Sequence, residues 1–371
     1  MGLICAVLHA VSREMFHVKH YFIGDRIDGL SVETWPRFHY NKERCQTRGV
    51  NTMFDLKEYS KTIIKLNLFS LGLMHVSNRF ISSMALTSNM LKPGVGKYYR
   101  WQHGDVFYHK TGSGSPVVLL HHLDPAFSAY EWNEIEDQLS TMHTVYSVDL
   151  PGCGRSVKDN TTYTNYYYVL FLSSFIKDVV RKKCIVMASG YSSSFAIMTA
   201  SMNDSLIDKI IAVNPMGLKE RAQTSNKKSK AASIILSLPI IGTSVYNISE
   251  GRDNIDLAFT EKYLYNPFRS QKRFVSAFYE GAHYSESNGR HLLASVKGKY
   301  MTVDLRKALA KIGDRLVILY GDKMDKTSKV AACYQHVNPS VKVLSVSNTK
   351  FLPHMERPEA FIEAYKASRK Q

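Results

Sequence analysis

The chain has 371 residues, of which 44% are hydrophobic and 22% are charged, as in an ordinary folded globular protein. These proportions exclude wholesale disorder, because a disordered chain has too little apolar surface to bury. The 48 Lys and Arg against 32 Asp and Glu give a formal net charge of +16, which attracts the chain to anionic surfaces but does not specify a fold.

The five cysteines are scattered along the chain and form no C-x-x-C pair. This spacing argues against a disulfide framework and a zinc site, and it favours a reducing compartment. We therefore expect a cytoplasmic protein that uses no metal. No G-x-G-x-x-G or P-loop pattern occurs, so no nucleotide cofactor is expected. The basic residues form no reading helix or aromatic-basic platform, and the sequence gives no support to nucleic-acid binding.

Residues 1–52 form an irregular leader with neither a helical nor a strand period. Residues 15–20 can be encoded by ATGTTTCACGTGAAACAT, which reads identically on the complementary strand and resembles the palindromic chromosome-partition sites of bacteria. Two interpretations stay open. The leader is either translated upstream DNA, with Met53 as the natural start, or a disordered extension of the protein.

An amphipathic helix is predicted within residues 53–96. Apolar residues recur there at spacings of three and four and give the helix one apolar face. They are Ile63, Leu66, Phe69, Leu73, Val76, Phe80 and Met84. The uncharged stretch 66–78 is too short to span a bilayer. We expect the segment 55–91 either to dock on the following domain or to lie on an anionic membrane surface.

From about residue 97 onward, short β-rich runs alternate with helical patterns, which is typical of a sheet covered by helices. The runs 117–120 and 316–319 are apolar at every position, as in buried parallel strands. Strands are predicted at 98–103, 105–110, 116–121, 144–150, 184–189, 209–214, 316–321 and 341–346. Helices are predicted at 129–139, 166–180, 192–202, 328–336 and 358–368. The fold class is therefore α/β, with a doubly wound, mostly parallel eight-stranded sheet and an antiparallel edge at the first two strands.

Several motifs in this region resemble those of the α/β-hydrolase superfamily, in the same order and at similar spacing. Residues 114–121 resemble the strand before the oxyanion loop, and residues 213–215 resemble the end of the sixth strand. Residues 148–156 contain the pattern D-x-P-G-x-G-x-S, and residues 353–359 read P-H-x-E-x-P-E. The resemblance implies the α/β-hydrolase fold, with its core in residues 97–215 and 305–371. The intervening residues 216–304 then form a helical cap.

The nucleophile of this family lies on a G-x-S-x-G turn between a strand and a helix. Counting back without gaps from residues 213–215 places Gly190 at the nucleophile position, and glycine has no side chain that could attack a substrate. A register shifted by two residues places Ser192 there instead. That shift puts Phe195 where the family packs a small residue.

The positions of the base and the acid also depart from the family pattern. Phe351 occupies the position of the catalytic histidine, and His354 corresponds to a second histidine that is usually structural. Met324 occupies the position of the acid, and Asp325 follows one residue later. His354 and Asp325 are therefore the substitutes that a rebuilt triad would use.

The oxyanion loop differs as well, because the usual H-G pair reads His121-His122. The resemblance assigns the oxyanion loop to His122 and Leu123, with Ser193 at the start of the helix. Asp124 nearby would oppose a developing negative charge, unless its carboxylate caps the following turn.

Two functions stay open. The first is a hydrolase of ester-like or small apolar substrates, in which Ser192 attacks, His354 acts as base and Asp325 orients the histidine. The second is a non-catalytic pseudo-hydrolase that binds a ligand or a partner. The cap aromatics suit a small apolar or acyl ligand if they line a pocket, or else they form the core of the cap. They are Phe259, Tyr263, Tyr265, Phe268, Phe274, Phe278 and Tyr279.

Overall fold

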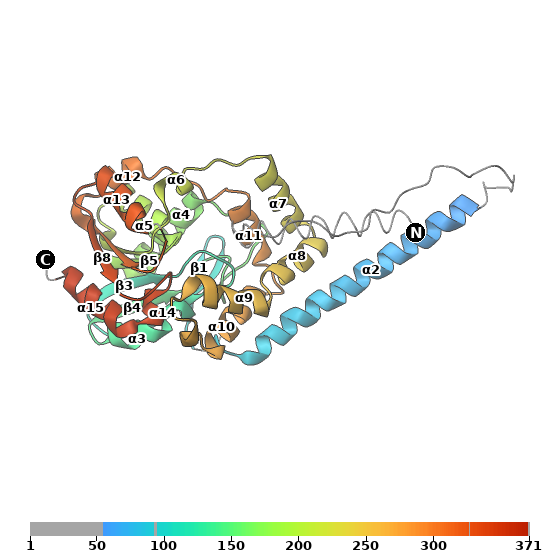
Figure 1. Ribbon diagram of the computed structural model, residues 1–371, viewed down its shortest axis with the longest axis horizontal. Helices are drawn as coiled ribbons and strands as arrows, with labels where there is room; N and C mark the ends of the chain where they lie inside the picture. Colours follow the sequence, from blue (N-terminus) through green and yellow to red (C-terminus); the bar gives the residue numbers. More distant parts are fainter. Residues whose placement is uncertain (1–54, 93–94, 326, 370–371) are drawn as a thin grey trace, which may run out of the picture. The chain divides into compact units, whose positions relative to one another are not determined.

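The computed structural model describes residues 55–92, 95–325 and 327–369 (Figure 1). The chain divides into two compact units, residues 1–68 and residues 69–371. Of the first unit, only the beginning of helix α2 (Asp55–Ala85) is described. The interpretations offered for residues 1–52 lie outside the described residues.

The larger unit is built on an eight-stranded sheet, counted over the described residues, in the order β1-β2-β4-β3-β5-β6-β7-β8. The strands are β1 (Lys97–Trp101), β2 (Gly104–Thr111), β3 (Ser115–Leu120), β4 (His143–Val148), β5 (Cys184–Ser189), β6 (Ile207–Val213), β7 (Leu316–Gly321) and β8 (Lys342–Val346). Strand β2 pairs antiparallel with both β1 and β4, and all the other neighbours are parallel. The predicted mostly parallel sheet with an antiparallel edge is confirmed.

The first strand is shorter than predicted, because it ends in a tight hairpin. Trp101 pairs with Gly104, so Gln102 and His103 form the turn and do not extend the strand. Gly104 has a φ of 115°, which a residue with a side chain adopts only with strain.

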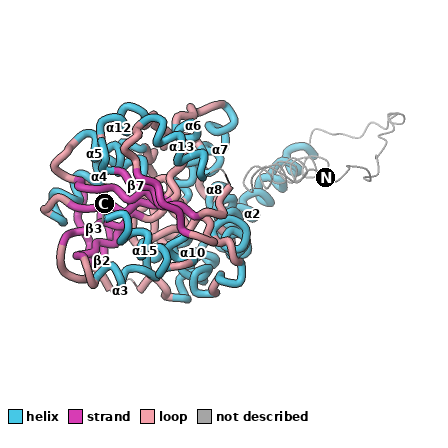
Figure 2. Tube along the Cα trace, turned by 60° about the vertical axis from the view of Figure 1, so that its left-hand side comes forward, coloured by secondary structure: helices cyan, strands magenta, loops and turns pink. Residues whose placement is uncertain are grey.

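Helices cover both faces of the sheet (Figure 2). Helices α3 (Asn133–Ser140) and α15 (Pro358–Arg369) pack on one face, and α4 (Asn165–Phe175), α5 (Ser192–Met202), α12 (Arg306–Lys311) and α13 (Thr327–Val337) pack on the other. On β3, Val117 and Leu119 lie on the face covered by α3 and α15, whereas Val118 and Leu120 lie on the opposite face. Both faces of the strand are buried, which explains why it is apolar at every position.

A helical insertion follows β6 and precedes β7, at the position where the sequence predicts a cap. Its helices are α6 (Leu218–Arg221), α7 (Lys227–Ser237), α8 (Ile241–Ser249), α9 (Arg252–Ala258), α10 (Lys272–His283) and α11 (Arg290–Lys297). The short helix α14 (Pro353–Glu356) lies between β8 and α15. We refer to the segment from α6 to α11 as the insertion.

The turn after β4 is held by a buried ion pair between Asp149 and Arg155, with Nε 2.7 Å from Oδ2. The carboxylate also accepts hydrogen bonds from the amides of Ala129 (2.7 Å) and Arg155 (2.8 Å). Burial raises the pKa of Asp149, but the Arg155 guanidinium and the two amides lower it by more, so the pKa lies below its usual value. Arg155 also donates to the carbonyl of Leu91 (2.5 Å), so the ion pair joins the turn to the chain that follows α2.

The ion pair generates a prediction for stability. Asp149→Ala leaves Arg155 buried without its partner, so we expect the free energy of unfolding in urea at pH 7 to fall by about 3–5 kcal/mol. Asp304→Ala removes an exposed pair with Arg306 and is the matched control, with little expected change.

The same pair predicts the direction of a pH dependence. The folded-state pKa of Asp149 is depressed, so its contribution is fully present above the unfolded-state pKa of about 4 and is lost as the pH falls through the folded-state value. The gap in unfolding free energy between the native chain and Asp149→Asn should therefore narrow on acidification below about pH 4. A gap that stayed constant with pH would contradict this assignment.

Candidate functional site

A strand-to-helix turn joins β5 to α5, and Gly190 lies in it with a φ of 51°. A Cβ built at this position would overlap Nδ1 of His122. It would also lie 2.8 Å from Cε1 of that ring and 3.0 Å from Cζ of Phe351. These separations are shorter than ordinary van der Waals contacts. The space that a nucleophilic side chain would need is therefore already filled.

The ring that fills this space belongs to His122, in the loop after β3. Its centroid lies 4.9 Å from the ring of Phe351 and 5.0 Å from the ring of Phe127, in edge-to-face geometry. The backbone amide of Tyr191 donates to Nδ1 of His122 over 3.3 Å. Burial lowers the pKa of His122, which favours the neutral imidazole with Nδ1 as the acceptor.

The two departures at positions 122 and 190 are complementary. Where the resemblance expects glycine, this chain has the His122 side chain, and where it expects the nucleophile, this chain has Gly190. The amide that follows the nucleophile is one of the donors to the oxyanion in this fold. Here that amide, of Tyr191, donates to the imidazole.

The serine that the shifted register selects is the first residue of α5. Ser192 is fully buried, and its hydroxyl donates to the main-chain carbonyl of His121. Its neighbour Ser193 donates to the carbonyl of Ala188 over 3.0 Å. Both hydroxyls are therefore engaged with main-chain carbonyls beside the start of the helix.

His354 lies in α14 and is fully buried. Its Nε2 is 3.0 Å from Oε1 of Glu131, and its ring stacks on Trp132 with the centroids 4.2 Å apart. The other carboxylate oxygen of Glu131 accepts the amide of His122 over 2.6 Å. Burial raises the pKa of Glu131, but the neighbouring His354 and the His122 amide lower it by more, so the carboxylate is charged.

Asp325 is exposed on the loop after β7, whereas Met324 is half-buried beside the cluster that contains Phe351. Ser192, His354 and Asp325 therefore come from three separate environments. Within the part of the chain that the structure describes, no hydrogen bond or ion pair joins any two of them. No three His, Cys, Asp or Glu among the described residues are placed to hold a metal ion.

The remaining residues of the oxyanion loop have structural contacts. Leu123 is buried in the core beneath the loop. The carboxylate of Asp124 accepts the amide of Ala126 over 3.1 Å, so it caps the turn that follows. Its role as a turn cap is one of the two readings that the sequence leaves open.

The aromatic side chains of the insertion form a cluster with the residues around His122. Phe278 lies 4.7 Å from Phe127 and 4.8 Å from Phe259, between ring centroids, and Tyr263 lies 5.8 Å from Phe351. Tyr265 and Phe268, in contrast, are exposed. The inner aromatics thus pack against Phe127, in the loop that carries His122, and against Phe351.

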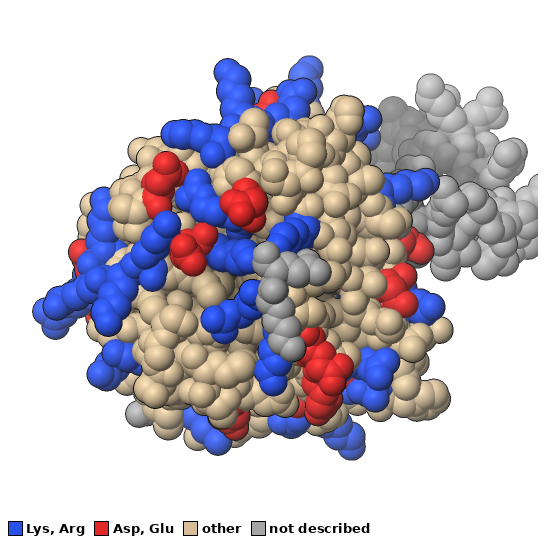
Figure 3. Space-filling model, turned by 90° about the vertical axis from the view of Figure 1, so that its left-hand side faces the viewer, with Lys and Arg blue, Asp and Glu red and all other residues tan. Residues whose placement is uncertain are grey.

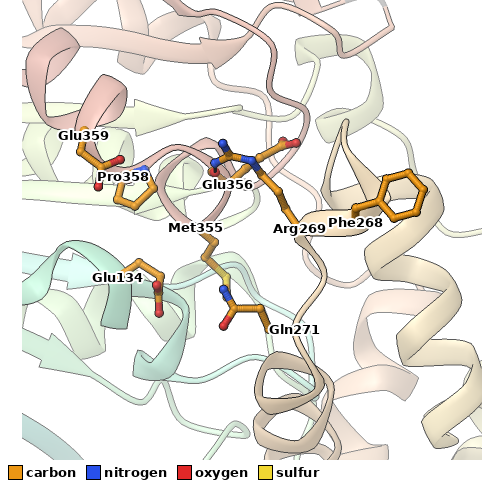
Figure 4. Close-up of a pocket in the computed structure, with 8 residues that line it drawn as sticks. All are labelled: Glu134, Phe268, Arg269, Gln271, Met355, Glu356, Pro358 and Glu359. Carbon is orange, nitrogen blue, oxygen red and sulfur yellow. Dashed lines mark hydrogen bonds between the residues drawn. The ribbon is translucent and has the colours of Figure 1, made fainter.

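A surface groove of about 350 Å³ lies elsewhere, between the insertion and the start of the last helix (Figure 4). Its lining residues are Glu134, Phe268, Arg269, Gln271, Met355, Glu356, Pro358 and Glu359. None of them is a residue of the turn around Gly190 or of the shifted triad. The Glu356 carboxylate accepts the amides of Tyr265 and Asn266, each over 2.8 Å, so it is used to hold the insertion in place.

The sequence singles out both His122 and Gly190 as departures, but it does not reveal that they meet. The missing signal is the pairing itself, since the two residues are 68 positions apart in the chain. Their reciprocal change, a gained side chain at one position and a lost one at the other, is the pattern that could have suggested contact.

Residues 117–364 match a family model described as the alpha/beta hydrolase family. None of the curated protein sequences compared with the chain matches it significantly.

Solved structures agree with the fold. A serine hydrolase involved in carbazole degradation superposes with a TM-score of 0.62 at 14% identity, over 74% of this chain and 98% of its own. A meta-cleavage product hydrolase from Pseudomonas fluorescens IP01 gives 0.59 at 15% identity, over 74% and 99%. A membrane phospholipase A gives 0.59 at 14% identity, over 85% and 98%. Identities this low show a shared fold alone.

The contact between positions 122 and 190 can be measured by a double-mutant cycle. Gly190→Ser should lower the free energy of unfolding by about 1–3 kcal/mol through overpacking, beyond the backbone strain of a positive φ. Gly313→Ser is the matched control, because Gly313 has a φ of 62° and open space around its Cβ position. In the His122→Ala background, the cost of Gly190→Ser should fall toward that of the control, with a remainder from the Phe351 contact. Equal costs in both backgrounds would show that the two positions do not compete for space.

Proposed function

The chain belongs to the α/β hydrolase family, and we propose that it is a non-catalytic member that keeps the fold and acts by binding. The observation that carries the proposal is the overlap between the His122 imidazole and the side-chain position of Gly190. Covalent catalysis in this fold needs a nucleophile at the strained turn, since only there does it face the oxyanion donors and the base.

The surroundings support the same conclusion. The amide of Tyr191 donates to His122, so it is engaged before any substrate arrives. Phe351 occupies the position of the base, and a phenyl ring cannot transfer a proton. Met324, at the position of the acid, has no charge that could orient a histidine. Each of the three positions has an apolar or absent side chain where the chemistry requires a polar one.

The competing proposal is a hydrolase of ester-like or small apolar substrates that uses Ser192, His354 and Asp325. It requires Ser192 to leave the carbonyl of His121 and His354 to leave the carboxylate of Glu131. Both side chains are fully buried, so these exchanges would break the hydrogen bond of Ser192 and separate the His354 ring from the Glu131 carboxylate inside the core. The buried contacts therefore favour the non-catalytic proposal.

A fluorophosphonate probe distinguishes the two proposals. We expect no covalent adduct by intact-mass spectrometry on the full chain, nor on Ser192→Ala or Ser189→Ala, with circular dichroism showing that all three are folded. An adduct on the native chain that disappears only in Ser192→Ala would establish a working nucleophile and overturn the proposal.

A reconstructed turn provides the positive control. In Gly190→Ser combined with His122→Gly and Phe351→His, the nucleophile and the base return to the family positions, and the imidazole that blocks the turn is removed. We expect this triple variant to form a fluorophosphonate adduct at position 190, whereas Gly190→Ser with His122→Gly alone reacts at least tenfold more slowly, because its serine lacks a base. A triple variant that is folded but unreactive would show that more than these positions blocks catalysis.

A further inference from the structure

Helix α2 presents its apolar face outward. Phe69, Leu73, Val76 and Phe80 are 70%, 59%, 63% and 64% exposed, and Met84 continues the row. At 100° per residue, these five positions fall within about 80° of arc on one side of the helix. We call these five residues the exposed apolar stripe. A helix of a globular protein normally turns such a stripe toward the core.

The opposite side of the same helix faces the protein, and two of its buried residues are polar. Asn78 and Ser82 are 6% and 5% exposed. Asn78 donates to the carbonyl of Ile240 (3.1 Å) and accepts from Ser244 (3.1 Å) and Asn247 (3.0 Å). Its amide thus has three partners, all in or beside α8, which fixes the rotation of the helix about its axis. The outward direction of the apolar stripe is therefore set by buried hydrogen bonds.

The end of α2 is anchored in the same way. The buried carboxylate of Glu280 in α10 accepts from the hydroxyl of Ser88 (2.8 Å) and from the amide of Met90 (2.5 Å). Ser82 pairs with the hydroxyl of Ser287 over 2.8 Å. These contacts hold the helix from Asn78 to its C-terminal end against the insertion, so the stripe cannot turn inward without breaking them.

The insertion adds apolar surface beside this helix. Helix α8, whose Ser244 and Asn247 donate to Asn78, exposes Ile241 and Ile248. None of the described helices is by itself long and apolar enough to cross a membrane. The pair 227–237 and 241–263, bent by 106°, meets the criteria of length and composition only when taken together. Exposed apolar surface of this extent marks an interaction site.

Charge decides between the candidate partners. Residues 60–92 contain Lys61, Lys65, Arg79 and Lys92 but no Asp or Glu, and Arg79 forms an exposed ion pair with Glu286 over 2.9 Å. A second copy of the chain docked through the same stripe would bring these like charges together. Anionic lipid headgroups would neutralise them. Lys227, Lys228 and Lys230 at the start of α7 are exposed as well.

The basic character of the chain is not confined to this helix. Figure 3 shows a face on which Lys and Arg predominate but are interspersed with Asp and Glu. What distinguishes residues 60–92 is the combination of an uninterrupted positive balance with the exposed apolar stripe. An interfacial helix on anionic lipid needs both properties together.

We propose that α2 lies in the plane of an anionic membrane surface, with the exposed apolar stripe inserted among the lipid chains and its basic residues at the headgroups. This inference does not depend on whether the site around Gly190 is catalytic. It also accounts for the stripe's length. From Phe69 to Met84 it extends about 22 Å along the helix, which is too short to span the hydrocarbon core but suits a helix lying flat.

Liposome flotation of the purified full chain tests the proposal. We expect the native chain to float with vesicles of phosphatidylcholine and phosphatidylglycerol, and to bind at least tenfold less to phosphatidylcholine alone or in high salt. Leu73→Gln combined with Phe80→Gln should reduce the partition coefficient at least tenfold. The matched control is Leu170→Gln with Met202→Gln, two exposed apolar residues of the core helices, which should bind like the native chain.

Two outcomes would overturn the proposal. One is equal flotation of the native chain and the Leu73→Gln, Phe80→Gln variant, with both shown to be folded by near-ultraviolet circular dichroism. The other is an absence of flotation together with a native dimer in light scattering that this variant dissociates. The second outcome would assign the stripe to contact between two copies of the chain.

Discussion

The packing of the His122 imidazole against Gly190 is the contact on which the arrangement around the β5–α5 turn depends. A glycine at a strained turn would leave a void next to the sheet, and voids in protein cores are costly. The ring fills that void, packs edge-on against Phe127 and Phe351, and accepts the amide of Tyr191. The loop that carries His122 is thereby packed against aromatic side chains next to the sheet.

The surrounding polar groups follow from this arrangement. The main-chain amide of His122 donates to Glu131, and the carboxylate of Glu131 also faces His354, so one buried acid holds the loop and the start of α14 together. Such a buried charge is tolerated only when its hydrogen bonds are made. His354 thus faces a buried carboxylate, and the hydroxyl of Ser192 at the start of α5 donates to a main-chain carbonyl.

Helix α2 illustrates the reverse of normal amphipathic packing. Its hydrogen bonds to the insertion come from Asn78, Ser82 and the residues after its end, whereas the exposed apolar stripe is left outside. In water this exposure is unfavourable, because large apolar side chains remain hydrated. The proposed insertion of the stripe among lipid chains would remove this cost.

The sequence by itself determined the α/β fold and the order of its main strands and helices, and it predicted that the nucleophile, base and acid positions depart from the family pattern. These features depend on local periodicity and on short motifs, such as residues 148–156, whose residues lie close together in the chain. The sequence also showed that α2 has one apolar face. Only the tertiary structure decided that Asn78 turns this face outward and that His122 occupies the space at Gly190. Both results depend on contacts between residues distant in the chain, and neither periodicity nor motif spacing reports which distant side chains share a volume.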